Sequence, residues 1–443
     1  MSAPILTLLA YAMIIVFMAL IMTKRLSVLT ALIIVPILTG LLAGFGGALG
    51  PMMLDGVRAI APTGIMLAFA IIYFGLMIDV GLFEPVVRLV VRLVGGDPVR
   101  TVIGTAVLAL TVSLDGDGST TYLIVTAAML PLYKRLGLSR LVLASVIMQA
   151  GCIMNILPWG GPTARAAAAL KLDVRDLFVP MIPAMLAGAA WVIFVAWRLG
   201  LSERARLGVH PVPEDEVLPA DAGSRAEAEA ARRPKLFWFN LALTFLLMGS
   251  LVAGLLPLPI LFMTACAVAL AVNYPNLAEQ RDRVAAHAGN ALAVAGVIFA
   301  AGVFTGILSG TKMIDAMAHS VVNLVPPALG PHLAVITAVL SVPFTFFISN
   351  DAFYYGVVPI LAEAGSHYGI SVVEIGRAAL VGQAVHLLSP LVPSTYLLVG
   401  LCGVELGDHQ KFTLKWTLGA AGVLLVITLL TGVVPLTGGG MPR

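Results

Sequence analysis

Two pairs of interrupted apolar segments, one pair in each half of the chain, decide the fold. The first pair reads SLDGDGSTTYL from Ser113 and NILPWGGPTAR from Asn155; the second reads ISNDAFYYG from Ile348 and HLLSPLVPSTY from His386. Each stretch inserts small polar residues, glycine or proline between apolar arms. Broken apolar segments at corresponding positions of two halves are typical of the binding site of a secondary transporter.

The spacing of the two pairs also matches. When the halves are aligned on the Gln-Ala pair that begins at Gln149 and again at Gln383, Asp117 and Asp351 fall the same distance upstream. This indicates an internal repeat rather than two unrelated interruptions.

The composition identifies a membrane protein. The 443 residues are 60% hydrophobic and 11% charged, with a mean hydropathy of +1.01, which excludes an ordinary soluble domain. Spanning segments in lipid must be helices of about 20 apolar residues. The expected full spans are residues 4–22, 27–45, 58–80, 140–170, 177–199, 237–256, 258–274, 289–310, 375–403 and 413–435. Residues 100–133 and 331–364 are broken centrally and are predicted to be re-entrant helical hairpins.

The distribution of basic residues predicts the topology. If the N-terminus lies outside and the spans alternate, most of the 26 lysines and arginines collect on one side, which should be the cytoplasm. Five full spans in each half make the second half an inverted copy of the first. We expect repeats at 1–199 and 237–443, joined by a polar cytoplasmic linker at 200–236, with both termini outside.

The first hairpin tip carries several candidate ligands for a cation or a proton. Asp115, Asp117, Ser119 and Thr120 lie between apolar arms, beside glycines that permit a tight turn. At membrane depth, such a loop must be shielded by protein or line a water-filled cavity. The alternative is an ordinary turn outside the bilayer.

The first broken span is predicted to unwind around residues 157–162 and to restart as a helix near Thr163, because proline and glycine weaken a helix. The free N–H groups of that helix and the charge of Arg165 would attract an anion. Arg165 could instead reach the interface or pair with an aspartate. The candidate binding residues here are Asn155, Gly160, Gly161, Thr163 and Arg165.

The candidate binding residues of the second half carry less charge. Its hairpin tip contributes Ser349, Asn350 and Asp351, and its broken span contributes Ser389, Ser394 and Thr395. His386 is either a proton carrier, since its unperturbed pKa is about 6.5, or a hydrogen bonder between helices.

At these residues the chain resembles the CitMHS family of bacterial metal-citrate/proton symporters, within the ion transporter superfamily. The resemblance covers nearly the whole chain and includes SLDGDGSTTYL, MLPLYKRLGLS, NILPWGGPTARAA, FISNDAFYYG and LSPLVPSTYLLVG. It implies proton-driven uptake of citrate complexed with a divalent ion such as magnesium or calcium, in the bacterial cytoplasmic membrane, with no permanent cofactor and no nucleic-acid partner. By wider analogy it implies a site at mid-membrane depth in a homodimer with elevator-like motion. The Ser-Asn-Thr tips of sodium-coupled relatives are absent here.

Two alternatives remain open from the sequence. A sodium-coupled di- or tricarboxylate or gluconate carrier could use the same architecture, and the driving ion would distinguish it. An intramembrane aspartyl protease would pair two aspartates on separate spans, but LDGDG lacks the Gly-x-Gly-Asp order of that class. We therefore expect a transporter and no enzymatic activity.

Overall fold

The fold is all-helical across the described residues. The computed structural model describes residues 3–94, 96–116, 118–208 and 231–439, and these form helices and turns with no strand. Asp117 lies outside the described residues, as does most of the expected polar linker. Within the described part, seven helices are long and apolar enough to cross a membrane, and five shorter apolar helices accompany them. The prediction of an all-α polytopic membrane protein is confirmed.

Both halves of the chain run through a similar order of elements. The first half contains α1 (Ala3–Met22), α2 (Val28–Leu42), η1 (Gly46–Ala48), α3 (Leu49–Asp79), α4 (Glu84–Val94), α5 (Pro98–Val112), η2 (Ser113–Asp115), α6 (Gly118–Leu136), α7 (Arg140–Met154), α8 (Gly161–Leu170), α9 (Val174–Phe178), η3 (Val179–Met181) and α10 (Ile182–Leu207). The second contains η5 (Pro234–Leu236), α12 (Phe237–Ala253), α13 (Leu258–Asn273), α14 (Leu277–Gly310), α15 (Met313–Leu324), η6 (Gly330–His332), α16 (Leu333–Phe347), the π-helix η7 (Ala352–Val357), α17 (Val358–Ser366), α18 (Val372–Leu380), α19 (Gln383–His386), α20 (Pro393–Cys402) and α21 (Leu406–Leu430).

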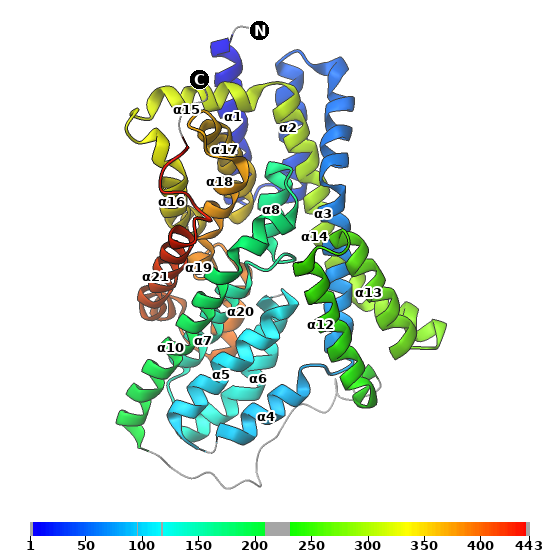
Figure 1. Ribbon diagram of the computed structural model, residues 1–443, viewed down its shortest axis with the longest axis vertical. Helices are drawn as coiled ribbons and strands as arrows, with labels where there is room; N and C mark the ends of the chain where they lie inside the picture. The colour runs from blue at the N-terminus through cyan, green and yellow to red at the C-terminus, as the bar shows by residue number, and fades with distance from the viewer. Residues whose placement is uncertain (1–2, 95, 117, 209–230, 440–443) are drawn as a thin grey trace.

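The two expected hairpins correspond to α5–α6 and α16–α17, and they lie at opposite ends of the molecule (Figure 1). Each is followed by a broken span, α7–α8 or α18–α20. The first residues of α1 and the segment after α21 lie at the same end as the second hairpin (Figure 1). The inverted repeat and the placement of the termini relative to the membrane stay predictions.

The two longest helices, α3 and α14, pack together through glycines. A Cβ added to Gly56 would lie 2.0 Å from the carbonyl oxygen of Gly302 and 2.7 Å from the Cα of Gly306, so the two backbones are in direct contact. Lipid gives little hydrophobic drive for helix association, and small residues at an interface instead allow close van der Waals packing. This contact makes α3 and α14 a closely packed pair, which also contacts α8 and the two hairpin tips (Figure 1).

Two amphipathic helices were not anticipated from the sequence. After α3 the chain forms α4, and after α14 it forms α15, each leading into a hairpin. In α4 the charged residues Glu84, Arg88 and Arg92 recur every four positions, while Leu89 and Leu93 are more than half exposed. Helices of this pattern lie in the membrane interface rather than crossing it.

Candidate substrate site

The first broken span is interrupted where its sequence contains two prolines and two glycines. Helix α7 ends at Met154 and α8 begins at Gly161, close to the expected break and restart. A Cβ on Gly160 would lie 2.2 Å from the carbonyl oxygen of Asn155, so the turn accepts only glycine there. Thr163 is fully buried and donates its hydroxyl to the carbonyl oxygen of Ile156 at 2.7 Å. This bond satisfies a carbonyl that the break leaves without a helical partner.

The second broken span is interrupted between α19 and α20, at residues 387–392. Thr395 is fully buried and donates to the carbonyl oxygen of Leu387 across this break, as Thr163 does in the first half. Ser394 lies beside it at the start of α20. The two restarting helices are therefore held to their preceding segments by the same kind of bond.

Several predicted residues of the second half bond to the arm of the second hairpin. His386 is buried, and its Nδ1 lies 2.8 Å from the carbonyl oxygen of Thr345. Ser389 is fully buried and donates to the carbonyl oxygen of Phe346 at 2.6 Å. The Thr345 hydroxyl in turn donates to the carbonyl oxygen of Gly382 at 2.9 Å. These contacts tie α16 to the broken span, and they correspond to the interhelical hydrogen-bonding interpretation of His386.

The second hairpin tip is also fixed to the broken span by side-chain amides. Asn350 and Gln383 exchange hydrogen bonds of 3.3 and 3.1 Å, and Gln383 also donates to the hydroxyl of Tyr354 at 3.0 Å. Ser349 accepts a bond of 3.1 Å from the N–H of Ala352 and so caps the following helix. The repeated Gln-Ala pair thus has a structural role in this half.

An ion pair joins the second hairpin tip to the first broken span. The Nε of Arg165 on α8 lies 2.7 Å from a carboxylate oxygen of Asp351, and the two side chains are 25% and 13% exposed. A Cβ on Gly161 would lie 2.5 Å from an Arg165 guanidinium nitrogen, so this glycine leaves room for the guanidinium over the N-terminus of α8. A permanent charge therefore lies beside the free N–H groups of a helix end, and the carboxylate of Asp351 neutralises the guanidinium.

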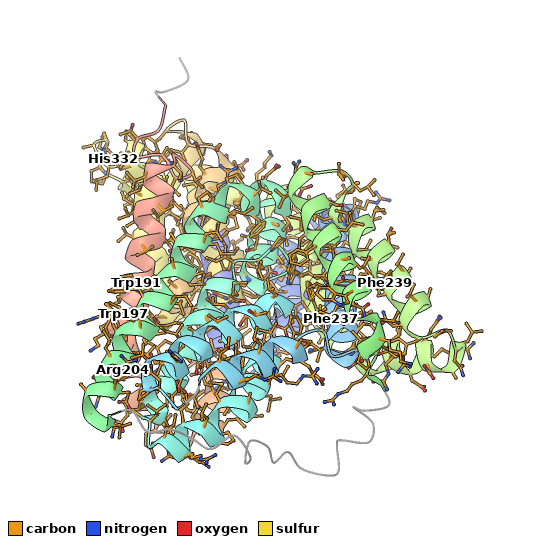
Figure 2. The ribbon with its side chains drawn as sticks, turned by 60° about the horizontal axis from the view of Figure 1, so that its bottom comes forward. Trp191, Trp197, Arg204, Phe237, Phe239 and His332 are labelled. Atoms are coloured by element: carbon orange, nitrogen blue, oxygen red, sulfur yellow. The ribbon has the colours of Figure 1, made fainter. Side chains whose placement is uncertain are left out.

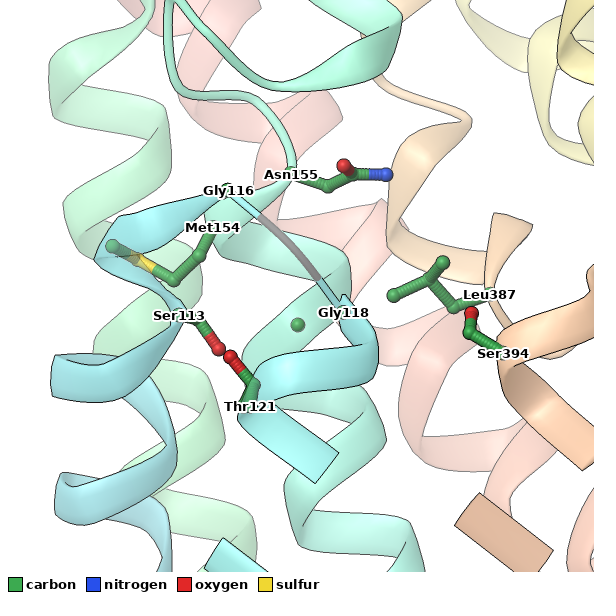
Figure 3. A pocket seen from close by; sticks show the side chains of 9 residues that line it. Ser113, Gly116, Gly118, Thr121, Met154, Asn155, Leu387 and Ser394 are labelled. Carbon is green, nitrogen blue, oxygen red and sulfur yellow. The ribbon is translucent and has the colours of Figure 1, made fainter. Parts of the chain in front are cut away.

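The first hairpin tip forms a small cavity with both broken spans. The cavity measures about 50 Å³ and is lined by Ser113, Gly116, Gly118, Thr121, Gly151, Met154, Asn155, Leu387 and Ser394. Figure 3 shows the side chains of Ser113 and Thr121 pointing toward one another. Both hydroxyls are buried and have no hydrogen-bond partner among the described residues. Two unsatisfied hydroxyls at a cavity are candidates for binding a solute, since burial without a partner is costly.

Trp159 holds this tip in place. Its indole N–H donates to the carbonyl oxygen of Leu114 at 2.9 Å, and its ring covers Gly116, whose φ of +77° requires glycine. The ring also contacts Phe74 of α3 and Phe262 of α13, with centroids 4.9 and 5.4 Å away. The unwound segment therefore contacts the first hairpin on one side and helices α3 and α13 on the other.

The structure thus brings the predicted residues together in two groups. Asn155 and Ser394 lie at the cavity of the first tip, together with the buried Asp115 and the half-buried Ser119 and Thr120 nearby on the same hairpin. Arg165 and Asp351 form the second group. Ser113, Thr121 and Trp159 were missed as candidates, although the first two are the first and last serine or threonine of the quoted stretch.

The described residues contain no cluster of three or more histidine, cysteine, aspartate or glutamate side chains able to hold a metal ion.

Solved structures support the architecture. The fold is similar to that of the Alcanivorax borkumensis YdaH transporter, with a TM-score of 0.63 at 17% identity over 89% of this chain and 91% of that one. It is also similar to Neisseria gonorrhoeae MtrF, described as one of a class of antimetabolite efflux pumps, with a TM-score of 0.61 at 14% identity over 91% and 88% of the two chains. At these identities the likeness concerns the fold alone.

Sequence relatives identify the family. The chain is 61% identical to a Bacillus subtilis (strain 168) protein named "Citrate transporter", over 97% of this chain and 99% of that one. It is 53% identical to a "Mg(2+)/citrate complex secondary transporter" of the same organism, over 98% and 100% of the two chains. Residues 4–382 match the family model CitMHS, described as "Citrate transporter". The chain therefore belongs to the CitMHS family of citrate transporters, and is a membrane transporter rather than an enzyme.

Proposed function

We propose that this chain is a secondary active transporter that imports citrate complexed with a divalent metal ion, in symport with protons. The named activities of the two Bacillus subtilis relatives support citrate and its magnesium complex as the substrate. The proposed location is the bacterial cytoplasmic membrane, which the relationship to these bacterial transporters supports. The assignment of residues rests on the two groups at the hairpin tips.

The observation that carries the proposal is the 2.7 Å ion pair between Arg165 and Asp351, which belong to different halves of the chain. The Asp351 carboxylate occupies the position that a substrate carboxylate would take at the Arg165 guanidinium. Citrate entering the site would replace Asp351 at Arg165, because both present the same group to the guanidinium. Asp351 would then be left without its counter-ion, and a proton is the simplest species to neutralise it.

The metal end of the substrate complex requires oxygen ligands rather than a positive charge. A divalent metal prefers oxygen ligands and often keeps some of its water. The hydroxyls of Ser113, Thr121 and Ser394 and the amide of Asn155 offer oxygens at the first tip. Metal-citrate would therefore span the two groups, with its metal toward the first tip and a free carboxylate toward Arg165.

The cavity at the first tip is small. A cavity of about 50 Å³ is far below the roughly 300–1,000 Å³ typical of small-molecule sites. The substrate must reach this site from each side of the membrane in turn, which is what alternating access requires. We propose that the hairpins and broken spans move together against the α3–α14 pair in an elevator-type motion, within a homodimer.

Uptake into proteoliposomes of the purified protein tests this function. Labelled citrate is offered with magnesium, calcium, other divalent ions or excess chelator, under an imposed proton gradient or an imposed sodium gradient. We expect uptake to require the divalent ion and to follow the proton gradient. Equal uptake under excess chelator would reject the metal complex, and dependence on sodium alone would favour a sodium-coupled carrier.

A further inference from the structure

A basic pocket lies away from the hairpin tips, where the end of α3, the start of α4 and the start of α12 meet. It measures about 350 Å³, and the residues that line it include Gly81, Glu84, Arg88, Arg232, Phe237 and Trp238. We call these the headgroup pocket. We propose that it binds the headgroup phosphate of an anionic phospholipid.

The position of the headgroup pocket places it at the membrane surface. The apolar span of α3 ends at Asp79, and the apolar span that includes α12 begins at Pro234, so both reach the edge of the bilayer here. Amphipathic α4 runs between them and exposes Leu89 and Leu93, as a helix lying in the interface does. Figure 2 turns this end of the molecule toward the reader and labels Phe237 near the start of α12.

The charges of the headgroup pocket favour an anion. Arg88 is exposed and has no ion-pair partner among the described residues, and Arg232 pairs with Glu84 at 2.6 Å. Two arginines and one glutamate leave a net positive charge. Guanidinium groups bind phosphate through paired hydrogen bonds, and basic pockets at the cytoplasmic ends of spans bind lipid headgroups. The charge distribution predicts that this end faces the cytoplasm.

The aromatic residues favour a lipid over a free phosphate. Trp238 is 76% exposed and packs edge-on against Phe237, with ring centroids 5.2 Å apart. Exposed tryptophan at the end of a span is typical of the headgroup region, where one side of the ring meets acyl chains. A free phosphate would gain nothing from this apolar wall, whereas the glycerol and first methylenes of a phospholipid would.

The backbone around the headgroup pocket is well fixed. The N–H of Arg233 donates to the carbonyl oxygen of Val80 at 3.2 Å, and the Tyr73 and Thr244 hydroxyls, 2.8 Å apart, link α3 to α12. Helix α4 packs against α5 and α6 of the first hairpin. A lipid held here would contact the end of α3, the start of α12, and α4, which leads into the first hairpin.

The test uses full-length protein purified in detergent, with thermal unfolding measured against added phosphatidylglycerol, phosphatidylcholine or inorganic phosphate, and retained lipid counted by native mass spectrometry. The variant Arg88→Gln/Arg232→Gln is compared with wild type and with Arg92→Gln, which removes a charge from α4 outside the headgroup pocket. Unfolding without added lipid shows whether each variant is folded.

We expect phosphatidylglycerol, but not phosphatidylcholine, to stabilise the wild type and Arg92→Gln. The double variant should bind phosphatidylglycerol at least tenfold more weakly, since it loses two charge-assisted contacts. Glu84→Gln should bind more tightly, because it frees Arg232. An equal loss in Arg92→Gln, or stabilisation by inorganic phosphate as large as that by phosphatidylglycerol, would overturn the proposal.

Discussion

Replacing Arg165 tests the substrate contact most directly. In Arg165→Lys the positive charge remains, but the planar fork that meets a carboxylate at 2.7 Å is lost. A charge-assisted hydrogen bond contributes about 1.5–3 kcal/mol, and each 1.4 kcal/mol is a factor of ten. We therefore expect the KM for metal-citrate uptake to rise by roughly 10- to 150-fold in proteoliposomes, with the protein still folded. An unchanged KM would show that Arg165 does not hold the substrate.

Replacing Asp351 separates binding from coupling. Asp351→Asn removes the competing carboxylate and mimics a protonated aspartate. We expect exchange of labelled for unlabelled metal-citrate to continue, while uphill uptake driven by a proton gradient falls by about tenfold or more. Breaking a fully buried ion pair costs about 3–5 kcal/mol, and with Arg165 25% exposed we expect stability to fall by about 3 kcal/mol at most. Uphill uptake with the wild-type pH dependence would refute the role of Asp351.

The exchanged pair, Arg165→Asp with Asp351→Arg, distinguishes a structural ion pair from a functional one. If the pair only holds the hairpin tip to α8, the exchange should restore both folding and transport. If Arg165 also binds substrate over the N-terminus of α8, the exchange should restore unfolding temperature but leave uptake at background. Recovery of transport in the exchanged protein would therefore contradict the proposed site.

Three further predictions concern single features. Gly306→Leu should destabilise the α3–α14 contact by several kcal/mol, whereas Gly249→Leu, at an exposed position where a Cβ meets nothing within 4 Å, should change the unfolding midpoint little. Burial raises the pKa of Asp97, but the bond from Arg204 and a backbone N–H outweigh it, so the pKa lies below its usual value. This ion pair contributes about 0.5–1 kcal/mol to the free energy of unfolding, a small value because Arg204 is 40% exposed. The contribution is present above about pH 4 and is lost as the pH falls further, so Asp97→Asn should remove this acid-dependent part of the stability. Thr121→Val should weaken metal-citrate uptake about tenfold without lowering stability, and loss of stability instead would make Thr121 structural.

The hairpins and broken spans could be predicted from the sequence because their signals are local. Proline and glycine mark the break at 155–160, and the polar tip residues mark 113–118, within a few residues of the observed bounds. The amphipathic helix α4 could have been found from its charges at every fourth position, and α15 from Asp315, His319 and Asn323, which have the same spacing. Both helices lie between strongly apolar spans. Helix α10 continues to Leu207, past residue 200 where the linker is expected to begin.

The partners of the site residues could not be predicted, because they depend on tertiary packing. Arg165 was expected either to attract an anion or to meet an aspartate, but nothing in the sequence selects Asp351 among the acidic residues. The same holds for His386, whose ring nitrogen meets the carbonyl oxygen of Thr345 on another helix. Which way a side chain points around a helix axis is fixed only when its neighbours are in place.

The contacts around the site differ in kind, and this difference supports the direction of motion that we propose. Directional hydrogen bonds join the second hairpin to its broken span, through Asn350 with Gln383 and through Ser389 with Phe346. By contrast, Trp159 meets Phe74 and Phe262 only through ring faces and edges. Sliding of Trp159 along these rings breaks no hydrogen bond there, and elsewhere on this boundary the exposed 3.2 Å bond from Lys171 to Ser309 of α14 would be exchanged for water. Separating the hairpin from its broken span would instead leave buried amides unpaired. The hairpins and broken spans are therefore expected to move as one body, and the boundary at Trp159 is where that body should slide past α3 and α13.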